Sequence, residues 1–449
     1  MIANPWIAIA LAMTAFLALF GALKLYARLA QPHPESVRKL LHAGSGLLTL
    51  SFPFLFNEVW PVLLLTGATA ILFATIKLSP WWHRRLGHVV NGVARTTLGE
   101  IYFPTAVAIV FWLSFGQTPL LFVIPVLVLT LADATGAVIG LRYGQSHYVG
   151  ASKTVEGSAA FVIVAFFCIH VPLLVWSDIG RVETLLISAT LALVVMLLEG
   201  SAWRGLDNLF IPIGGYFLLR AYLPLDVPAL AVRFVVVVTL VILVILSRRS
   251  TTLADDSLVA GVFLCYVTWA LMGFRWLVPP LLVFVGYSLM SPPTPANSRR
   301  MHDVPVILSV WAAAVAWLTI ARASGDPRLI FPFTLVFATH LAIFGTSRLA
   351  ADFPTRAVPV LIVRALSISW IVVLLPFVLL EGVAGRTFLL SIAGVAAMAI
   401  GVVLFVRTQP SIRNAPQDRR RWALQAASAA VASMAGWLIA MAIHAAGIA

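Results

Sequence analysis

Long runs of hydrophobic residues recur along the whole chain and are separated by short polar or basic connections. About 20 apolar residues are enough to cross the hydrocarbon core of a bilayer as an α-helix. The runs therefore predict an all-α, polytopic integral membrane protein with about 14–16 transmembrane helices. The predicted segments are 4–27, 40–56, 59–78, 99–115, 119–141, 158–176, 184–200, 210–223, 229–247, 257–274, 276–291, 304–322, 329–347, 358–380, 387–406 and 422–446. The 210–223 segment is short and contains Pro212, so a re-entrant segment is the alternative there.

Composition supports a membrane protein, because 61% of the residues are hydrophobic and only 10% are charged, against about 25% charged in soluble proteins. The net charge is +13, and the basic residues fall mainly on alternate connections, which is typical of cytoplasmic loops. We therefore interpret the positive charge as a topology signal, with both termini on the non-cytoplasmic side, and expect no nucleic-acid partner. Cys168 and Cys265 lie inside apolar segments and show no metal or redox spacing.

The chain divides near residue 248 into halves of different character. Residues 1–247 hold nearly all the polar groups inside or beside apolar segments, and we predict that they form a catalytic membrane domain. Residues 248–449 are more uniformly apolar and are interpreted as a second membrane domain. Its histidines, including His302 and His340, show no ligand spacing and are assigned no role.

Asp133 ends an apolar run and is followed by Gly136 and Gly140. A carboxylate at membrane depth is costly and is usually functional, so Asp133 is predicted to bind a metal ion or a substrate. The two glycines permit close approach of a ligand or of another helix. A helix-packing stripe with an aspartate that reaches the membrane surface is the alternative interpretation.

The next connection carries Lys153, Thr154, Glu156, Gly157 and Ser158. A lysine, hydroxyl groups and free N–H groups at the start of a helix suit phosphate, and we predict a phosphate-binding loop. A helix cap at Thr154 with an acidic residue in the first turn would explain two of these residues without a ligand. That alternative leaves Lys153, Gly157 and Ser158 unexplained.

Five more polar residues fall on the same predicted side of the membrane. They are Lys39, His42, Glu199, Asp207 and Asn208. Two acids and an amide near one segment boundary favour metal and hydroxyl positioning, although a turn and a helix-end charge are the alternative. His42 is equally interpretable as a packing residue. Because all these groups lie on the side with the basic connections, the sequence predicts one cytoplasmic site built from several helices.

These residues resemble the phytol kinase and dolichol kinase (polyprenol kinase) family over residues 35–225. The resemblance rests on Arg38, Lys39, His42, Asp133, Gly136, Gly140, Gly144, the 153–158 loop, Glu199, Asp207, Asn208 and Pro212. Ala132 stands where the family often has a glycine before the aspartate. The resemblance implies transfer of a phosphoryl group, typically from CTP and with Mg²⁺, to the terminal hydroxyl of an isoprenoid alcohol.

The resemblance also implies roles for individual residues. Asp133 and Asp207 would bind the metal ion and, with Lys153 and Glu199, would be catalytic. Nucleotide contacts would come from Lys39, His42, Gly136, Gly140, Thr154, Glu156, Gly157, Ser158 and Asn208. Either Asp207 or Glu199 would accept or orient the hydroxyl proton. We expect the protein in the bacterial inner (plasma) membrane, in contact with the lipid bilayer and with its site on the cytoplasmic side.

Two other functions share parts of this pattern. A membrane cytidylyltransferase that activates a lipid phosphate with CTP would use the same kind of site. A transporter or flippase of lipid-linked substrates could use the acids as ion sites, although all the polar groups cluster on one side. Residues 248–360 faintly resemble the phytyl-phosphate kinase family through residues 253–261, and this half is interpreted as a diverged partner domain or as extra structural helices.

Overall fold

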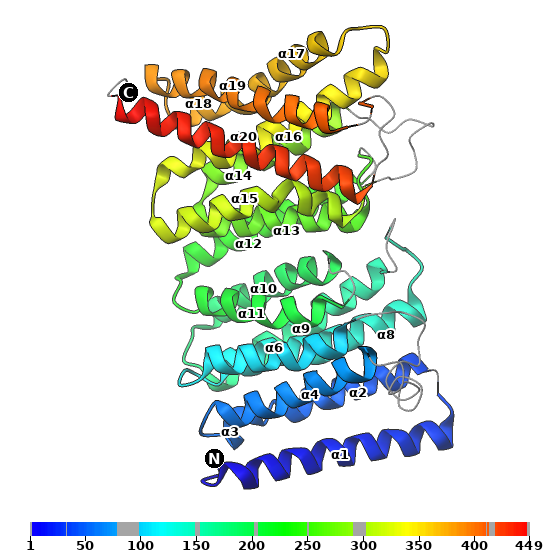
Figure 1. Cartoon of the computed structure of the whole chain (residues 1–449). Helices are drawn as coiled ribbons and strands as arrows, with labels where there is room; N and C mark the ends of the chain where they lie inside the picture. The colour runs from blue at the N-terminus through cyan, green and yellow to red at the C-terminus, as the bar shows by residue number, and fades with distance from the viewer. Residues whose placement is uncertain are drawn as a thin grey trace. The chain divides into compact units, whose positions relative to one another are not determined.

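The computed structural model describes residues 2–32, 34–78, 98–148, 153–201, 205–248, 251–290, 302–409, 411–412 and 418–446. Over these ranges the chain forms helices and no named strand, which confirms the all-α prediction (Figure 1). Eleven of the described helices are long and apolar enough to cross a membrane, by length and composition, and three shorter helices are also apolar. Each predicted segment overlaps a helix, so the chain has the architecture of a polytopic membrane protein.

Contacts divide the chain into two compact units, Met1–Thr239 and Leu240–Ala449. The helices of the first unit are α1 (Pro5–Ala30), α2 (Pro34–Thr49), α3 (Phe52–Leu55), α4 (Trp60–Leu78), α6 (Gly99–Ser114), α7 (Leu120–Leu127), the π-helical turn η1 (Val128–Ala132), α8 (Asp133–Tyr143), α9 (Val155–Trp176), α10 (Arg181–Ser201) and α11 (Asp207–Tyr222). Helix α12 (Val227–Ser247) begins in this unit and ends in the second.

The second predicted segment, 40–56, needs correction. Helix α2 begins at Pro34, six residues earlier than predicted, and ends at Thr49, and a separate short helix α3 follows. Pro53 stands in the first turn of α3. Proline has no backbone N–H and disfavours helical geometry in the residue before it, so it commonly begins a new helix and seldom continues one. The shift places more polar residues on α2 than the segment 40–56 contains.

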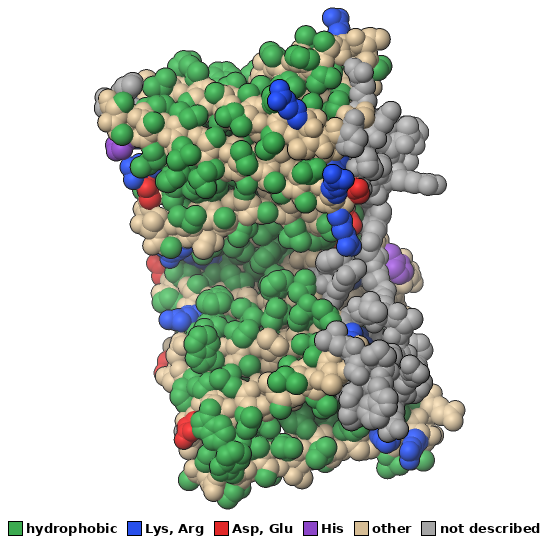
Figure 2. Space-filling model, in the orientation of Figure 1, with side chains coloured by type: hydrophobic (Ala, Val, Ile, Leu, Met, Phe, Trp, Pro, Cys, Tyr) green, Lys and Arg blue, Asp and Glu red, His purple; other side chains and the backbone are tan. Residues whose placement is uncertain are grey.

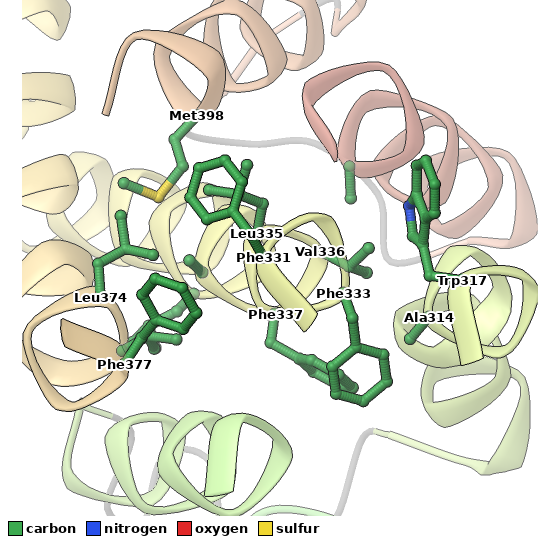
Figure 3. Close-up of a cluster of buried hydrophobic side chains, with 14 of the residues drawn as sticks. Ala314, Trp317, Phe331, Phe333, Leu335, Val336, Phe337, Leu374, Phe377 and Met398 are labelled. Atoms are coloured by element: carbon green, nitrogen blue, oxygen red, sulfur yellow. The ribbon is translucent and has the colours of Figure 1, made fainter. Parts of the chain in front are cut away.

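The second unit contains α13 (Asp255–Met272), α14 (Phe274–Met290), α15 (Val304–Ser324), η2 (Pro327–Leu329), α16 (Ile330–Asp352), α17 (Val358–Ser369), η3 (Trp370–Leu374), α18 (Leu375–Glu381), α19 (Gly385–Thr408) and α20 (Arg419–Ala445). Helix α16 contacts α14, α15, α17, α19 and α20, and almost all its side chains are buried. Figure 3 shows Phe331, Phe333 and Phe337 of α16 among side chains from the surrounding helices. The first three turns of α16 are apolar on all sides, which fits this central position.

Hydrophobic side chains also cover much of the outer surface of both units. Figure 2 shows them along the flanks of the helices, while most charged side chains in view lie toward the helix ends. The exposed hydrophobic side chains include large residues, each more than half exposed, such as Leu17, Ile71, Val235 and Leu289. Large continuous apolar surfaces are rare on soluble monomers. This surface is therefore suited to contact with lipid.

Candidate active site

The predicted site residues of the first unit come from five neighbouring helices. Lys39 lies in the second turn of α2 and His42 at its middle, and Asp133 is the first residue of α8. Lys153 precedes α9, Glu199 lies in the last turn of α10, and Asp207 begins α11. Helix α2 contacts α8, and α9 contacts both α8 and α10, which in turn contacts α11. These helices are therefore neighbours, and the residues at their ends lie in one region.

Asp133 forms an ion pair with a residue that is distant in the sequence. The Nζ atom of Lys39 donates a hydrogen bond of 2.8 Å to Oδ2 of Asp133, and the aspartate is only 6% exposed. The Nε2 atom of His42 lies 3.8 Å from the same oxygen and has no hydrogen-bond partner within the described chain. Asp133 is therefore held by one ammonium group and faces an imidazole that can still bind another group.

The spacing of residues on α2 explains this arrangement. Lys39, His42 and Gly46 are separated by three and four residues, so they lie on one face of the helix. A β-carbon at Gly46 would lie 2.0 Å from Oγ1 of Thr130, so α2 is in direct contact with the π-helical turn η1. Only glycine allows this approach, which places Lys39 and His42 beside the residue that follows the turn, Asp133.

The π-helical turn itself lies immediately before Asp133. It spans Val128–Ala132 within the continuous helical segment Leu120–Tyr143, after Pro125. Thr130 directs its hydroxyl to the carbonyl oxygen of Val126 at 2.6 Å. A π-turn adds a residue to the helix and changes the direction of the side chains after it, and such turns are frequent at functional sites. Periodicity of the sequence gave no sign of this turn.

Lys153 forms the second lysine–carboxylate pair. Its Nζ atom lies 2.7 Å from Oε1 of Glu199 and also donates to the backbone carbonyl oxygen of Glu199. Burial of the ammonium group opposes its charge, but the carboxylates of Glu199 and Asp207 outweigh burial and raise the pKa of Lys153 above its usual value. The loop before α9 therefore carries a fixed positive charge at the end of α10.

Backbone hydrogen bonds fix the two sides of the loop that contains Lys153. The N–H of Tyr148 donates to the carbonyl of Lys153 at 2.9 Å, and the N–H of Val155 donates to Ser146 at 2.9 Å. Glu156 accepts from the N–H of Ser146 at 3.0 and 3.2 Å through its two carboxylate oxygens. Glu156 thus braces the loop in this structure, and its predicted contact with a nucleotide stays a prediction.

Thr154 caps α9, as the alternative interpretation of this segment proposed. Its Oγ1 accepts from the N–H of Gly157 at 3.1 Å, and the side chain is buried. Ser158 is buried in the first turn, where its N–H donates to the carbonyl of Thr154 at 3.0 Å. The cap accounts for the Thr154 hydroxyl structurally, whereas the hydrogen bond of Ser158 is made by its backbone. The observation that remains for phosphate is the neighbouring ammonium group of Lys153.

The glycines after Asp133 form a close contact between α8 and α9. A β-carbon at Gly157 would lie 2.8 Å from the carbonyl oxygen of Gly136 and 3.2 Å from Cα of Gly140. A β-carbon at Gly140 would lie 2.9 Å from Oγ1 of Thr154. Helix packing therefore accounts for Gly136, Gly140 and Gly157, in the manner of small-residue helix contacts in membranes. Their predicted contacts with a ligand remain untested.

Asp207 and Asn208 begin α11, next to the start of α6. The carboxylate of Asp207 accepts from the N–H of Asn208 at 3.1 Å. Asn208 is buried, and its amide nitrogen would lie 2.5 Å from a β-carbon at Gly99. Gly205 has a φ of +88° and directly faces Gly99, so a side chain is unfavourable at both positions. This tight contact fixes where α11 begins and therefore where Asp207 lies.

Electrostatic interactions connect the two ion pairs into one cluster. Lys153 interacts with Asp133 and Asp207 as well as with Glu199, and His42 interacts with Asp133 and Asp207. Asp207 forms no ion pair within the described residues, unlike Asp133 and Glu199. Glu100, in the first turn of α6, forms an ion pair with Lys77 at 3.4 Å. The cluster therefore has two fixed cations and one carboxylate without an ion pair.

Comparison with known proteins supports the family resemblance. No protein-family model matches the chain, and no solved structure matches it. A curated protein named phytol kinase, from Synechocystis sp., is 28% identical over 213 residues, which cover 46% of this chain and 88% of that protein. The chain thus resembles a phytol kinase over slightly less than half of its length.

Proposed function

We propose that this protein is a membrane lipid kinase that transfers a phosphoryl group from a nucleotide, CTP, to the hydroxyl of an isoprenoid alcohol. The observation that carries the proposal is the convergence of the pairs Lys39–Asp133 and Lys153–Glu199, together with Asp207, at the ends of neighbouring helices. The similarity to a protein named phytol kinase supports the same reaction class.

Phosphoryl transfer depends mainly on positioning and on neutralisation of charge. In the proposed mechanism, phosphate oxygens of the nucleotide contact the ammonium groups of Lys39 and Lys153, in partial exchange for the carboxylates that now bind them. An ammonium group is a compact charge with three donors, so it can bind a carboxylate and a phosphate at the same time. His42 adds a nitrogen that has no partner within the described chain.

The acceptor alcohol has its hydroxyl at the helix ends and its apolar chain along the lipid-facing helices. In the proposed reaction, the alcohol oxygen forms a bond to the γ-phosphorus while the bond from this phosphorus to the bridging oxygen breaks, and CDP leaves. The hydroxyl proton passes to a carboxylate, Asp207 or Glu199.

The carboxylates also fit the Mg²⁺ that accompanies nucleotides. No group of three or more metal-binding side chains occurs in the described part of the chain. Mg²⁺ in nucleotide sites is usually held by one or two carboxylates together with phosphate oxygens and water, so Asp133 and Asp207 suffice as protein ligands. When bound, the ion would neutralise charge on the donor phosphates.

We place this site on the cytoplasmic side of the bacterial inner membrane, where CTP is available. The basic connections on the same side as the site support this orientation. The many apolar helices support an integral membrane protein.

Transfer can be tested with the full-length protein purified in detergent. It is incubated with Mg²⁺ and CTP or ATP, labelled in either the α- or the γ-phosphate, and with phytol, farnesol, geranylgeraniol or a longer polyprenol. The proposal expects γ-label in a lipid monophosphate and no α-label in lipid. Transfer of α-label to an added isoprenoid phosphate would instead identify a cytidylyltransferase. Absence of label from every lipid, with a protein that remains folded, would contradict both enzyme functions.

A further inference from the structure

The second unit contains a cavity of about 330 Å³ among α12, α13, α14, α15, α16 and α20. Its volume lies within the range of small-molecule binding sites, about 300–1,000 Å³. Apolar side chains form most of its wall, among them Leu258, Val262, Phe284, Val310, Phe337 and Leu341. The residues that line it belong to the second unit, so it is separate from the candidate active site.

Most polar residues of this cavity gather at one end. Among them are Ser247, Ser257, Tyr287, His302, Arg348 and Arg421. Most of them occupy the last turns of α12, α14 and α16 or the first turns of α13 and α20, and His302 lies just before α15. Because consecutive helices alternate in direction, these positions share one end of the unit. The cavity is therefore amphipathic, with a polar end and an apolar interior.

The polar end is positively charged. Arg348 and Arg421 line the cavity together with His302 and His340, and no aspartate or glutamate is among the described residues that line it. Arg348 is partly neutralised by Asp352, whose Oδ2 lies 3.1 Å from its Nε. Asp255 is buried nearby at 1% exposure, but Arg248 binds it at 2.7 Å. The sequence gave no indication of this buried pair, because the second half was interpreted as uniformly apolar.

The guanidinium group of Arg421 forms no ion pair within the described residues, and the nearby carboxylate of Asp418 accepts a hydrogen bond of 2.8 Å from the backbone N–H of Arg421. Arg421 is only 7% exposed, and its guanidinium group donates to Oγ of Ser347 at 3.0 Å and lies 5.4 Å from the ring of Phe405. Its Nε has no hydrogen-bond partner within the described residues. A buried charge is unfavourable unless it is paired and hydrogen-bonded. An anion at the polar end of the cavity would meet this requirement.

His340 offers a second donor deeper in the cavity. It is 2% exposed, and its Nδ1 accepts a hydrogen bond of 3.1 Å from the side-chain amide nitrogen of Gln425. With Nδ1 as the acceptor, the proton of the neutral ring lies on Nε2. This Nε2 has no partner within the described chain. Arg421 and His340 therefore both have unused hydrogen-bond donors, and no acidic residue is among the described residues that line the cavity.

We propose that the second unit binds a lipid that carries a phosphate group, with the phosphate at Arg421 and the apolar chain in the cavity. The guanidinium group matches phosphate oxygens in charge and planar geometry, and the apolar wall matches a hydrocarbon chain. An isoprenoid monophosphate and a glycerophospholipid of the bilayer share this chemistry. The inference does not depend on the reaction proposed for the first unit.

The test measures binding of defined lipids to the full-length protein in detergent by native mass spectrometry and competition. Farnesyl phosphate is compared with farnesol, which lacks the phosphate, and with dioleoyl phosphatidic acid. We expect the phosphate to raise affinity at least about 10-fold over the alcohol. Arg421→Gln should remove this difference and leave farnesol binding unchanged. If phosphatidic acid binds more strongly than farnesyl phosphate, the lipid is a phospholipid of the bilayer. If farnesyl phosphate binds more strongly, the lipid is an isoprenoid phosphate.

A cavity-filling variant tests the same site without removing a charge. A β-carbon at Gly261, which lines the cavity, would meet no atom within 4 Å, so Gly261→Leu adds volume there without a backbone clash. Gly385→Leu is the matched control, since Gly385 is equally open but lies outside the cavity. We expect Gly261→Leu to weaken binding of both farnesyl phosphate and farnesol, and Gly385→Leu to change neither.

Repeating the titrations in Lys153→Ala distinguishes lipid binding in the cavity of the second unit from lipid binding at the candidate active site of the first unit. The effects of Arg421→Gln and Gly261→Leu should persist in that background, whether or not phosphoryl transfer is observed. Equal affinity for farnesyl phosphate and farnesol in the unmodified protein would overturn the proposal. Unchanged phosphate binding in folded Arg421→Gln and Gly261→Leu proteins would overturn it as well.

Discussion

The Nζ atom of Lys39 and Oδ2 of Asp133 lie 2.8 Å apart, although 94 positions separate the two residues in the sequence. Both side chains are largely buried, at 12% and 8% exposure. A buried ion pair is weak evidence for stability, because removing both charges from water can cost as much as their attraction contributes. A functional requirement for the two charges explains their presence better than stability does.

We expect Asp133→Asn to lower the rate of phosphoryl transfer by about 100-fold or more. The loss of one charged or polar group that stabilises a transition state typically lowers the rate by about this factor. The substitution also leaves Lys39 buried without its partner, and breaking such a pair costs about 3–5 kcal/mol. Thermal unfolding in detergent measures this loss beside the transfer assay.

The double variant Lys39→Met with Asp133→Leu separates the two effects. It removes both charges, so most of the stability should return while transfer stays absent. Recovery of transfer in the double variant would show that neither charge takes part in the reaction.

Lys153→Ala should reduce use of the nucleotide by more than its loss of stability explains, because the ammonium group is proposed to meet phosphate charge, although the substitution also leaves Glu199 without its partner. Lys153→Arg should restore little activity, since a planar guanidinium group does not replace a compact ammonium. The effect on nucleotide use is measured from initial rates over a range of CTP concentrations, with circular dichroism as the folding control. Unchanged rates in Lys153→Ala would remove the assignment.

The pH dependence of this charge follows from its environment. The pKa of Lys153 is raised above its usual 10.5 by Glu199 and Asp207 despite burial. A raised lysine pKa stabilises the folded state at all pH values below the unfolded pKa, and the contribution is lost only as the pH rises through the folded pKa. We therefore expect no titration of Lys153 in the transfer rate or the unfolding temperature between pH 6 and 9. A loss over that interval that disappears in Lys153→Ala would contradict a permanently charged lysine.

Gly157→Ala should destabilise the contact between α8 and α9. The added β-carbon would lie 2.8 Å from the backbone carbonyl oxygen of Gly136, so a helix must move. Overpacking of this kind costs about 1–3 kcal/mol. Gly67→Ala in α4 is the control, because a β-carbon there meets nothing within 4 Å, and alanine favours a helix by about 0.5–1 kcal/mol. Equal unfolding temperatures for the two variants would refute the close contact.

The orientation of the protein can be tested with single cysteines. Ser146 precedes α9 and Asp178 follows it, both are exposed, and the native Cys168 and Cys265 are buried. If the site faces the cytoplasm, a membrane-impermeant maleimide should label Asp178→Cys in intact cells and Ser146→Cys only after the cells are opened. The reverse pattern would place the site away from cytosolic nucleotide.

The sequence by itself determined the class of this protein and the segments that hold its helices. Apolar runs of spanning length suffice for this, since a helix in lipid must be apolar over its length and satisfies its own backbone hydrogen bonds. The sequence also determined the family resemblance, because the acidic and lysine residues stand in a recognisable order. It placed α2 wrongly, since Pro34 and the polar first turns of that helix interrupt the apolar pattern from which its start was predicted.

Only the tertiary structure decided which of those residues contact one another. Lys39 binds Asp133 because Gly46 allows α2 to reach the π-helical turn, and Glu156 binds the loop at Ser146. The glycines after Asp133 have a packing role that sequence spacing could not separate from ligand binding. The cavity around Arg421 and His340 was equally hidden, since its residues come from helices spread over more than 170 positions. Pairing between distant helices is set by three-dimensional packing, and the periodicity of a single segment carries no information about its partner.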